Sequence, residues 1–187
     1  MLIIGITGTL GAGKGTVVEY LIQKHGFRHF SVRNYLTRII EEKGLTLNRD
    51  SMVAVANELR EKNSPSFIVE ELWREANQSK QNCIIESIRT VGEVEALRKK
   101  ENFLLLAVDA DIALRYDRVV VRGSSTDKIS FDVFKDNEAR EMHSADANKQ
   151  NLSACIALAD FKIDNNGDLN SLYKQTEAIL HERNKTS

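Results

Sequence analysis

The stretch LIIGITGTLGAGKGTVVEYLIQKHG, residues 2–26, decides the fold of this chain. An apolar run of strand length, Leu2–Thr7, leads into four glycines around one lysine, and an amphipathic helical pattern, Lys14–His25, follows at once. The residues Gly8–Lys14 fit the pattern G-x-x-x-x-G-K. Glycines let the backbone curl so that several N–H groups point at one anion, and the positive end of the next helix adds to them. The stretch therefore predicts a strand, a phosphate-binding loop and a helix that together hold ATP.

The candidate ATP-binding residues lie in this loop and at the start of the helix: Gly8, Gly11, Ala12, Gly13, Lys14, Gly15 and Thr16. Lys14 is also a candidate catalytic residue, because its ammonium would neutralise charge shared between the β- and γ-phosphates. A hydroxyl usually follows this lysine and binds Mg²⁺. Here Gly15 follows, and the hydroxyl comes one place later, at Thr16.

The string Gly-x-Gly-Lys-Gly-Thr, residues 11–16, resembles the loop of adenylate kinase and related nucleoside monophosphate kinases. The resemblance implies that Thr16 faces the α-phosphate and that Mg²⁺ is held largely through water. It favours phosphate transfer to a small molecule over a GTPase, in which the hydroxyl usually follows the lysine directly.

Runs of strand length alternate with helical patterns along the rest of the chain. The expected strands are Leu2–Thr7, Phe27–Val32, Cys83–Ile85, Phe103–Val108 and Asp160–Ile163. The expected helices are Lys14–His25, Ser31–Glu42, Asp50–Lys62, Phe67–Ser79, Val91–Lys100, Asp111–Arg122, Phe131–His143, Lys149–Ala159 and Leu169–Arg183. Several strand runs are apolar without alternation, which is typical of a parallel sheet covered on both faces.

The alternation predicts an α/β fold of the three-layer P-loop NTPase type: a parallel five-stranded sheet with helices on both faces. With 187 residues, of which 42% are apolar, we expect a single domain over residues 1–187. The polar stretch of residues 123–150 is expected to form a helical lid over a site. The helices within residues 31–80 are expected to bind the acceptor.

Charge and cysteine content restrict the partners and the compartment. A net charge of −1 gives no general attraction to nucleic acid or to a membrane surface, and no window approaches the roughly 20 apolar residues of a membrane span. The two cysteines, Cys83 and Cys155, lie in apolar stretches and are expected to be buried free thiols. We therefore expect a cytoplasmic protein, monomeric or homodimeric, whose partners are nucleotides and neither nucleic acid nor membrane.

A second motif is Cys83-Ile-Ile-Glu86-Ser87-Ile-Arg89, in which a buried strand ends in a carboxylate and an arginine follows three residues later. Because the carboxyl ends of parallel strands open on the ligand crevice, Glu86 and Arg89 should face the phosphate loop. Adenylate-kinase-like enzymes carry Asp-Gly-Phe-Pro-Arg or Asp-Gly-Ile-Arg here. The resemblance implies that Glu86 organises Mg²⁺ waters and that Arg89 holds the acceptor phosphate. The alternative is a helix N-cap with a surface arginine.

A third group of residues is an arginine-rich helix. In Asp111–Arg122, residues Arg115, Arg118 and Arg122 share one helical face, and Asp111 is placed to pair with Arg115. Arg140 lies in the next helix. The pattern resembles the lid arginines of nucleoside monophosphate kinases. The resemblance implies catalytic roles for Arg118, Arg122 and Arg140, and the alternative is a solvated basic face.

Two weaker motifs complete the site. Ser31-Val32-Arg33 follows the second strand, where adenylate kinases have Ser-Thr-Gly-Asp-Leu-Leu-Arg. The resemblance implies that Ser31 and Arg33 bind the acceptor. The alternative is an N-cap at Ser31, which explains much of the pattern. The run from Ala159 to Leu169 resembles the Ala-Asp-x-x-Ile-x-Asn-x-Gly-[ST]-Leu run of dephospho-CoA kinases, which places Asn166 and Gly167 near the adenine. An Asn-Gly turn is the alternative.

Taken together, these motifs make the chain similar to P-loop nucleoside monophosphate kinases, in an adenylate-kinase-like or dephospho-CoA-kinase-like branch with some likeness to deoxynucleoside monophosphate kinases. The activity that this implies is ATP-dependent phosphoryl transfer to a nucleoside or deoxynucleoside monophosphate, with Mg²⁺ bound through Thr16 and Glu86. Dephospho-CoA kinase is the nearest alternative, although that family has Asp-Ala-Asp after the second strand and this chain does not. An ATPase or ATP-dependent switch without a small acceptor stays open as well.

Overall fold

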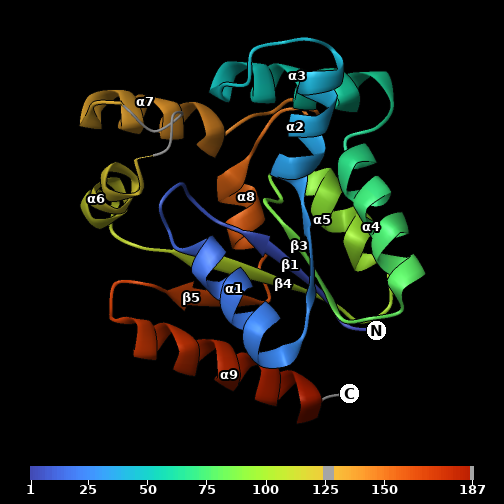
Figure 1. Cartoon of the computed structure of the whole chain (residues 1–187), viewed down its shortest axis with the longest axis vertical. Coiled ribbons are helices and arrows are strands. Elements are labelled where there is room, and N and C mark those ends of the chain that lie inside the picture. Colours follow the sequence, from blue (N-terminus) through green and yellow to red (C-terminus); the bar gives the residue numbers. More distant parts are fainter. Residues whose placement is uncertain (124–128, 186–187) are drawn as a thin grey trace.

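The computed structural model describes residues 1–123 and 129–185, so residues 124–128 of the expected lid lie outside the described residues. The described part of the chain forms one five-stranded sheet, seen at the centre of Figure 1. Its strands are β1 (Ile3–Thr7), β2 (Arg28–Ser31), β3 (Cys83–Glu86), β4 (Phe103–Asp109) and β5 (Phe161–Asp164). All neighbouring strands are parallel, in the order β2-β3-β1-β4-β5. The predicted α/β fold with a parallel five-stranded sheet is confirmed.

Helices cover both faces of the sheet. They are α1 (Lys14–His25), α2 (Val32–Glu42), α3 (Arg49–Lys62), α4 (Phe67–Ser79), α5 (Val91–Arg98), α6 (Ile112–Arg122), α7 (Phe131–Met142), α8 (Leu152–Ala157) and α9 (Leu169–Lys185). Figure 1 shows α1 and α9 together on one side of the sheet, and α4, α5 and α8 on the other. Among the described residues, no helix combines the length and the apolar character needed to cross a membrane.

The core explains why the strand runs are apolar without alternation. In β1, Ile3 packs into one cluster with residues of α2, α3, α4, α5 and α8, whereas Ile4 and Ile6 pack into a second cluster with residues of α1 and α9. Because successive side chains of a strand point to opposite faces, a strand with helices on both sides buries every position. All five residues of β1 are buried.

The helix boundaries differ from expectation where side chains cap them. The helix expected from Ser31 begins at Val32, because Ser31 is its N-cap and its hydroxyl accepts a hydrogen bond from the Asn34 N–H (3.2 Å). The helix expected over Lys149–Ala159 is α8 and begins only at Leu152. Asn151 caps it through the Ala154 N–H and donates its own N–H to the Arg89 carbonyl (2.8 Å), which holds the preceding residues away from the helix.

Candidate active site

The phosphate-binding loop joins β1 to α1, as the motif predicts, and two of its glycines are required by close packing. Gly8 has φ 134°, and a Cβ there would lie 2.0 Å from the Val108 carbonyl oxygen. Gly11 has φ 79°, and a Cβ there would lie 2.4 Å from the Arg115 carbonyl oxygen. Both positions combine a left-handed backbone with contact against main chain, so that a side chain would disrupt the loop.

Gly15 differs from the other glycines of the loop. A Cβ at this position would meet no atom within 4 Å, and its backbone is helical. The packing of the protein therefore leaves room for a side chain directly after Lys14. Only a bound ligand could require glycine here, so the role expected for Gly15 and Thr16 stays a prediction.

Lys14 turns its ammonium back onto its own loop. The Lys14 Nζ donates to the carbonyl oxygens of Gly8 (3.0 Å) and Thr9 (2.8 Å). The pKa of Lys14 is lowered to about 8, mainly by burial and also by the charges of Arg89 and Arg122, against the opposing charges of Glu86 and Glu141. Within the described ranges this ammonium donates to neutral carbonyls alone, so an incoming phosphate would be its first charged hydrogen-bond partner.

Residues from the β5–α9 loop and from α6 brace the phosphate loop. The Asn165 Nδ2 donates to the Ala12 carbonyl (2.8 Å), and the Arg118 Nη2 donates to the Asn165 carbonyl (2.8 Å). The Arg115 Nη1 reaches the Leu10 carbonyl (3.2 Å). Arg118 is thus bound beside the β5–α9 loop. The expected catalytic role of Arg118 stays untested.

The expected pairing of Asp111 with Arg115 is wrong. Asp111 instead caps α6, because its carboxylate accepts from the Ala113 N–H (2.9 Å). The Arg115 guanidinium forms a two-pronged ion pair with Glu138 of α7, with Nη2 3.0 Å from Oε1. A planar guanidinium matches both oxygens of a carboxylate, and buried Arg115 thereby links the phosphate loop to α7.

Asn166 and Gly167 lie in the β5–α9 loop, directly after Asn165, which braces the phosphate loop. The Asn166 Oδ1 accepts the Asp111 N–H (2.7 Å), and its Nδ2 donates to Asp164 (2.6 Å). The Asn166 side chain therefore fixes the loop against the start of α6. This position is compatible with the predicted location near an adenine.

Glu86 ends β3, next to the β1 strand that leads into the phosphate loop. Its carboxylate lies 3.2 Å from the His29 Nε2. Burial raises the pKa of Glu86, but the hydrogen bond from His29 and the charges of Lys14 and Arg89 outweigh burial and lower the pKa below its usual value. Glu86 is therefore ionised at neutral pH, as a carboxylate that orders Mg²⁺ waters must be.

The residue after Glu86 has a strained backbone. Ser87 has φ 72°, in the left-handed region where glycine is unstrained and other residues are not. The Asp-Gly sequence of the resembling enzymes would fit this turn without strain. Serine is held there because the Ser87 and Ile88 N–H groups both donate to the Ile6 carbonyl (3.0 and 3.1 Å).

Arg89 faces the site but is not free. Its Nη1 donates to the Glu141 Oε2 (2.6 Å) and to the Gln150 Oε1 (2.7 Å). The other oxygen of Glu141, Oε1, accepts from the Arg49 Nη2 (2.5 Å). Two arginines from distant parts of the chain therefore converge on one carboxylate of α7.

The backbone of Arg89 is fixed by a second, fully buried ion pair. Arg60 of α3 donates to the Glu93 Oε1 through Nε (3.2 Å) and Nη2 (2.7 Å). The Glu93 Oε2 accepts the N–H groups of Arg89 (2.8 Å) and Thr90 (3.1 Å). Within the described residues, the Arg60 Nη1 is buried without a hydrogen-bond partner.

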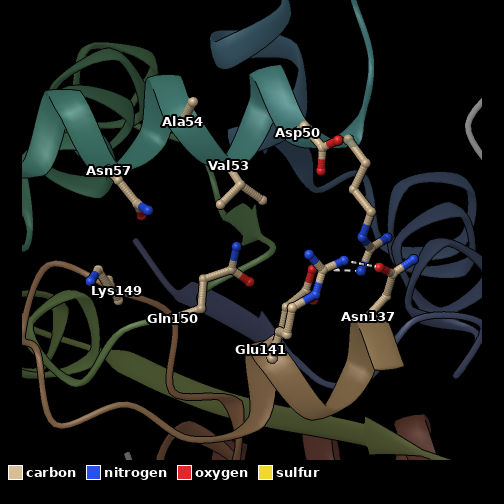
Figure 2. A pocket seen from close by; sticks show the side chains of 10 residues that line it. Asp50, Val53, Ala54, Asn57, Asn137, Glu141, Lys149 and Gln150 are labelled. Atoms are coloured by element: carbon tan, nitrogen blue, oxygen red, sulfur yellow. Dashed lines mark hydrogen bonds and ion pairs between the residues drawn. The ribbon is translucent and has the colours of Figure 1, made fainter. Parts of the chain in front are cut away.

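Two adjoining cavities lie beside this cluster. The smaller, of about 110 Å³, extends from Leu10 of the phosphate loop to α2 and α3, and it includes Arg33, Arg60 and Arg89 in its lining. The larger, of about 380 Å³, lies between α3 and α7. Figure 2 shows Val53 and Asn57 of α3 on one side of the larger cavity, with Glu141 and Gln150 opposite. Arg49, Val53, Glu141 and Gln150 line both cavities, which makes them one cleft.

The three predicted lid arginines do not converge on one point. Arg140 lines the larger cavity and donates to Asn137, whereas Arg118 donates to the Asn165 carbonyl and lines neither cavity. The positive charge of Arg122 acts on Lys14. Of the two acceptor candidates after β2, Arg33 lines the smaller cavity, whereas Ser31 serves as an N-cap and lines neither.

Several residues of the site carry no sequence signal. They are Arg49, Arg60, Glu138, Glu141 and Gln150, which lie outside every motif and whose side-chain contacts span 23 to 92 positions of sequence. An isolated charged residue on an amphipathic helix is indistinguishable from a solvated one until its helix is placed. These residues could therefore be found only from the fold.

The donor set of the site fits Mg²⁺ held mainly through water. In the described ranges, 1–123 and 129–185, no group of three or more His, Cys, Asp or Glu side chains could hold a metal ion. Mg²⁺ does not need such a cage, since it keeps several waters and binds one or two carboxylates together with substrate phosphates. Glu86 and Thr16 would supply the carboxylate and hydroxyl oxygens.

The chain is similar to known archaeal proteins over nearly its whole length. Residues 4–145 match the family described as AAA domain. A UPF0200 protein of Methanocaldococcus jannaschii is 30% identical over 185 residues, covering 97% of this chain and 90% of that protein. A UPF0200 protein of Methanococcus maripaludis strain C7 is 29% identical over 184 residues, covering 96% of both.

Solved structures share the fold at low identity. A Thermus thermophilus protein has a TM-score of 0.64 at 20% identity, with 97% of each chain covered. Shikimate kinase from Aquifex aeolicus has a TM-score of 0.56 at 14% identity, with 100% of each chain covered. A gluconokinase from Sinorhizobium meliloti has a TM-score of 0.54 at 12% identity, covering 97% of this chain and 92% of that one. The fold is thus that of P-loop kinases.

Proposed function

We propose that this chain, which belongs to the UPF0200 family and to the AAA domain family, transfers the γ-phosphoryl group of ATP to a nucleoside or deoxynucleoside monophosphate. The P-loop kinase-like fold supports ATP-dependent phosphotransfer. The observation that carries the choice of acceptor is the convergence of Arg49 and Arg89 on one anionic group, in a cleft next to Lys14.

On the donor side, the phosphate loop supplies inward N–H groups and the Lys14 ammonium. Lys14 would leave the Gly8 and Thr9 carbonyls for phosphate oxygens, exchanging two neutral partners for a charged one. Asn166 and Gly167 would contact the base, and Arg118 lies close enough to their loop to do the same. Mg²⁺, when bound, neutralises charge on the β- and γ-phosphates.

On the acceptor side, the cleft between α3 and α7 has the size and the polarity for a nucleotide. Its larger part, of about 380 Å³, lies within the range of small-molecule sites. Apolar side chains such as Val53 and Met52 provide contact area, and Asn57 and Asn137 provide hydrogen-bonding groups. Arg89 lies close enough to Lys14 to lower its pKa and lines the smaller cavity together with Leu10 of the phosphate loop, which supports an acceptor phosphate that faces the donor.

Little covalent chemistry is required of these residues. The protein has to align the attacking oxygen with the γ-phosphorus at about 3–3.5 Å, exclude water and neutralise charge. Arg89 can align the acceptor, because its main chain is fixed by Glu93 and its guanidinium can bind two phosphate oxygens.

The Arg89→Lys substitution tests this role. It keeps the charge and loses the two-pronged geometry, so we expect the acceptor KM to rise about tenfold or more and the ATP KM to stay within about twofold. Steady-state kinetics with each substrate varied in turn measures both constants. The matched control is Arg74→Lys on the exposed face of α4, which should change neither. Equal weakening of ATP and acceptor would place Arg89 on the donor side and contradict the assignment.

A further inference from the structure

Glu141 occupies an unusual position for a carboxylate in a cleft that is to bind an anion. It is buried, with 8% of its surface exposed. Each of its two oxygens accepts from a different guanidinium: Oε1 from Arg49 and Oε2 from Arg89. It belongs to α7, whereas the two arginines belong to α3 and to the segment after β3. Two arginines on the two oxygens of one anion is the arrangement by which a phosphate is commonly held.

The surroundings of Glu141 carry more positive charge than it neutralises. Six basic side chains line the joined cavities, namely Arg33, Arg49, Arg60, Arg89, Arg140 and Lys149. Two carboxylates line them, Asp50 and Glu141. Two more lie outside the lining, Glu93 as the partner of Arg60 and Asp146 as the partner of Lys149. The cleft is therefore electrostatically prepared for an anion of higher charge than a carboxylate.

An unused donor points to the same conclusion. Arg60 lines the smaller cavity and is 2% exposed, and in the part of the chain that the structure describes its Nη1 has no hydrogen-bond partner. An unpaired buried donor is costly, and a charged one more so. Both oxygens of Glu141 are already engaged by Arg49 and Arg89. A phosphomonoester has three terminal oxygens, one more than a carboxylate, and so can serve a third donor.

We propose that Glu141 is an internal stand-in for the acceptor's phosphate, and that a phosphomonoester dianion binds by displacing it from Arg49 and Arg89. This inference rests on the proposed function only in naming the ligand as the acceptor. Glu141 then sets specificity by charge. A carboxylate or a phosphodiester, each with a single negative charge, replaces Glu141 without electrostatic gain, whereas a dianion gains attraction to the same two arginines.

Displacement also couples the acceptor to α7. Once Glu141 leaves the two arginines, the Glu138–Arg115 ion pair still ties the helix to the phosphate loop. Binding of the acceptor thus changes the attachment of α7 to Arg49 and Arg89 and leaves its ion pair with Arg115 in place. Asp136 stands on the same helix, is exposed and lines neither cavity, and this makes it a matched control for the charge of Glu141.

The test measures binding of inorganic phosphate by calorimetry, with the phosphate loop filled by Mg²⁺ and a non-hydrolysable ATP analogue. At about pH 8 phosphate is a dianion. The Glu141→Gln protein should bind phosphate about tenfold more tightly than the unchanged protein, because the competing internal charge is gone. Asp136→Asn removes a carboxylate charge from an exposed position of the same helix, outside the lining of both cavities, and it should leave phosphate affinity unchanged. Unchanged or weaker phosphate binding by folded Glu141→Gln would overturn the proposal.

A second measurement uses the unchanged protein and so does not depend on the folding of a variant. In the same loaded state, inorganic phosphate should bind at least about tenfold more tightly than dimethyl phosphate or acetate, which carry one charge each. Equal binding of the three anions would contradict the proposal that Glu141 makes the site select dianions over anions of single charge. Neither assay needs turnover, so a protein that binds phosphate as described but transfers nothing to nucleotides would refute the proposed function and leave the stand-in role of Glu141 intact.

Discussion

A Lys14→Ala protein that stays folded should transfer phosphoryl groups about 10³-fold more slowly than the unchanged protein. Lys14 is the cation of the phosphate loop, and its ammonium bonds to the Gly8 and Thr9 carbonyls within that loop. Gly8 and Thr9 are buried, so the loss of this donor should also lower stability, and the change in rate is read only from protein that stays folded. The loss in rate arises because charge shared between the β- and γ-phosphates is then left without its compact counter-ion. Measured kcat and a melting curve of each protein separate the two effects.

Two further variants sharpen this prediction. Lys14→Arg should also fail, because a planar guanidinium does not replace a compact ammonium in a loop whose glycines pack against main chain. Lys24→Ala removes a lysine from the exposed last turn of the same helix and should leave turnover unchanged. Near-normal transfer by folded Lys14→Ala would remove the phosphate loop from the mechanism.

The largest effect on stability is expected from the buried pair of Arg60 and Glu93. Their side chains are 1% and 0% exposed. Glu93→Gln keeps the shape of the side chain and removes its charge, which leaves the Arg60 guanidinium buried without a counter-ion. Breaking a buried pair in this way costs about 3–5 kcal/mol. The substitution also weakens the acceptor for the Arg89 and Thr90 N–H groups at the start of α5.

Urea unfolding of Glu93→Gln measures this cost as a change in the free energy of unfolding. Glu95→Gln, two residues along the same helix and exposed, is the matched control and should change that free energy by less than about 0.5 kcal/mol. A loss below about 1 kcal/mol for Glu93→Gln would mean that Arg60 finds another partner or reaches solvent. It would also weaken the argument that its Nη1 awaits an oxygen of the ligand.

Much of the fold could be predicted from the sequence, because its signals are local. The glycine pattern of Gly8–Lys14 fixes a strand before it and a helix after it, and the unalternating apolar runs require helices on both faces of the sheet. Helix ends were harder to place where a side chain acts as the cap. Ser31 and Asn151 look like helical residues in a periodic pattern, yet each stands just before its helix and accepts a hydrogen bond from it.

The candidate site could be predicted only in part, for a physical reason. Motif residues such as Lys14 and Glu86 lie near each other because parallel strands end at one edge of the sheet. Their partners do not follow from that rule. Glu141 reaches Arg89 across 52 positions of sequence, and Arg115 pairs with Glu138 rather than with nearby Asp111. Such contacts depend on how α6 and α7 pack, which no local spacing encodes.

The most direct test of the proposed function is ADP release from Mg²⁺·ATP in the presence of each nucleoside monophosphate, each deoxynucleoside monophosphate and dephospho-CoA in turn. We expect at least one monophosphate to raise ADP release far above the rate with ATP alone and to be converted mole for mole into its diphosphate. Dephospho-CoA should have no effect, because the arginines of the cleft are assigned to the phosphate group that accepts the transfer. Stimulation by dephospho-CoA alone, or a slow release of ADP that no acceptor changes, would contradict the account.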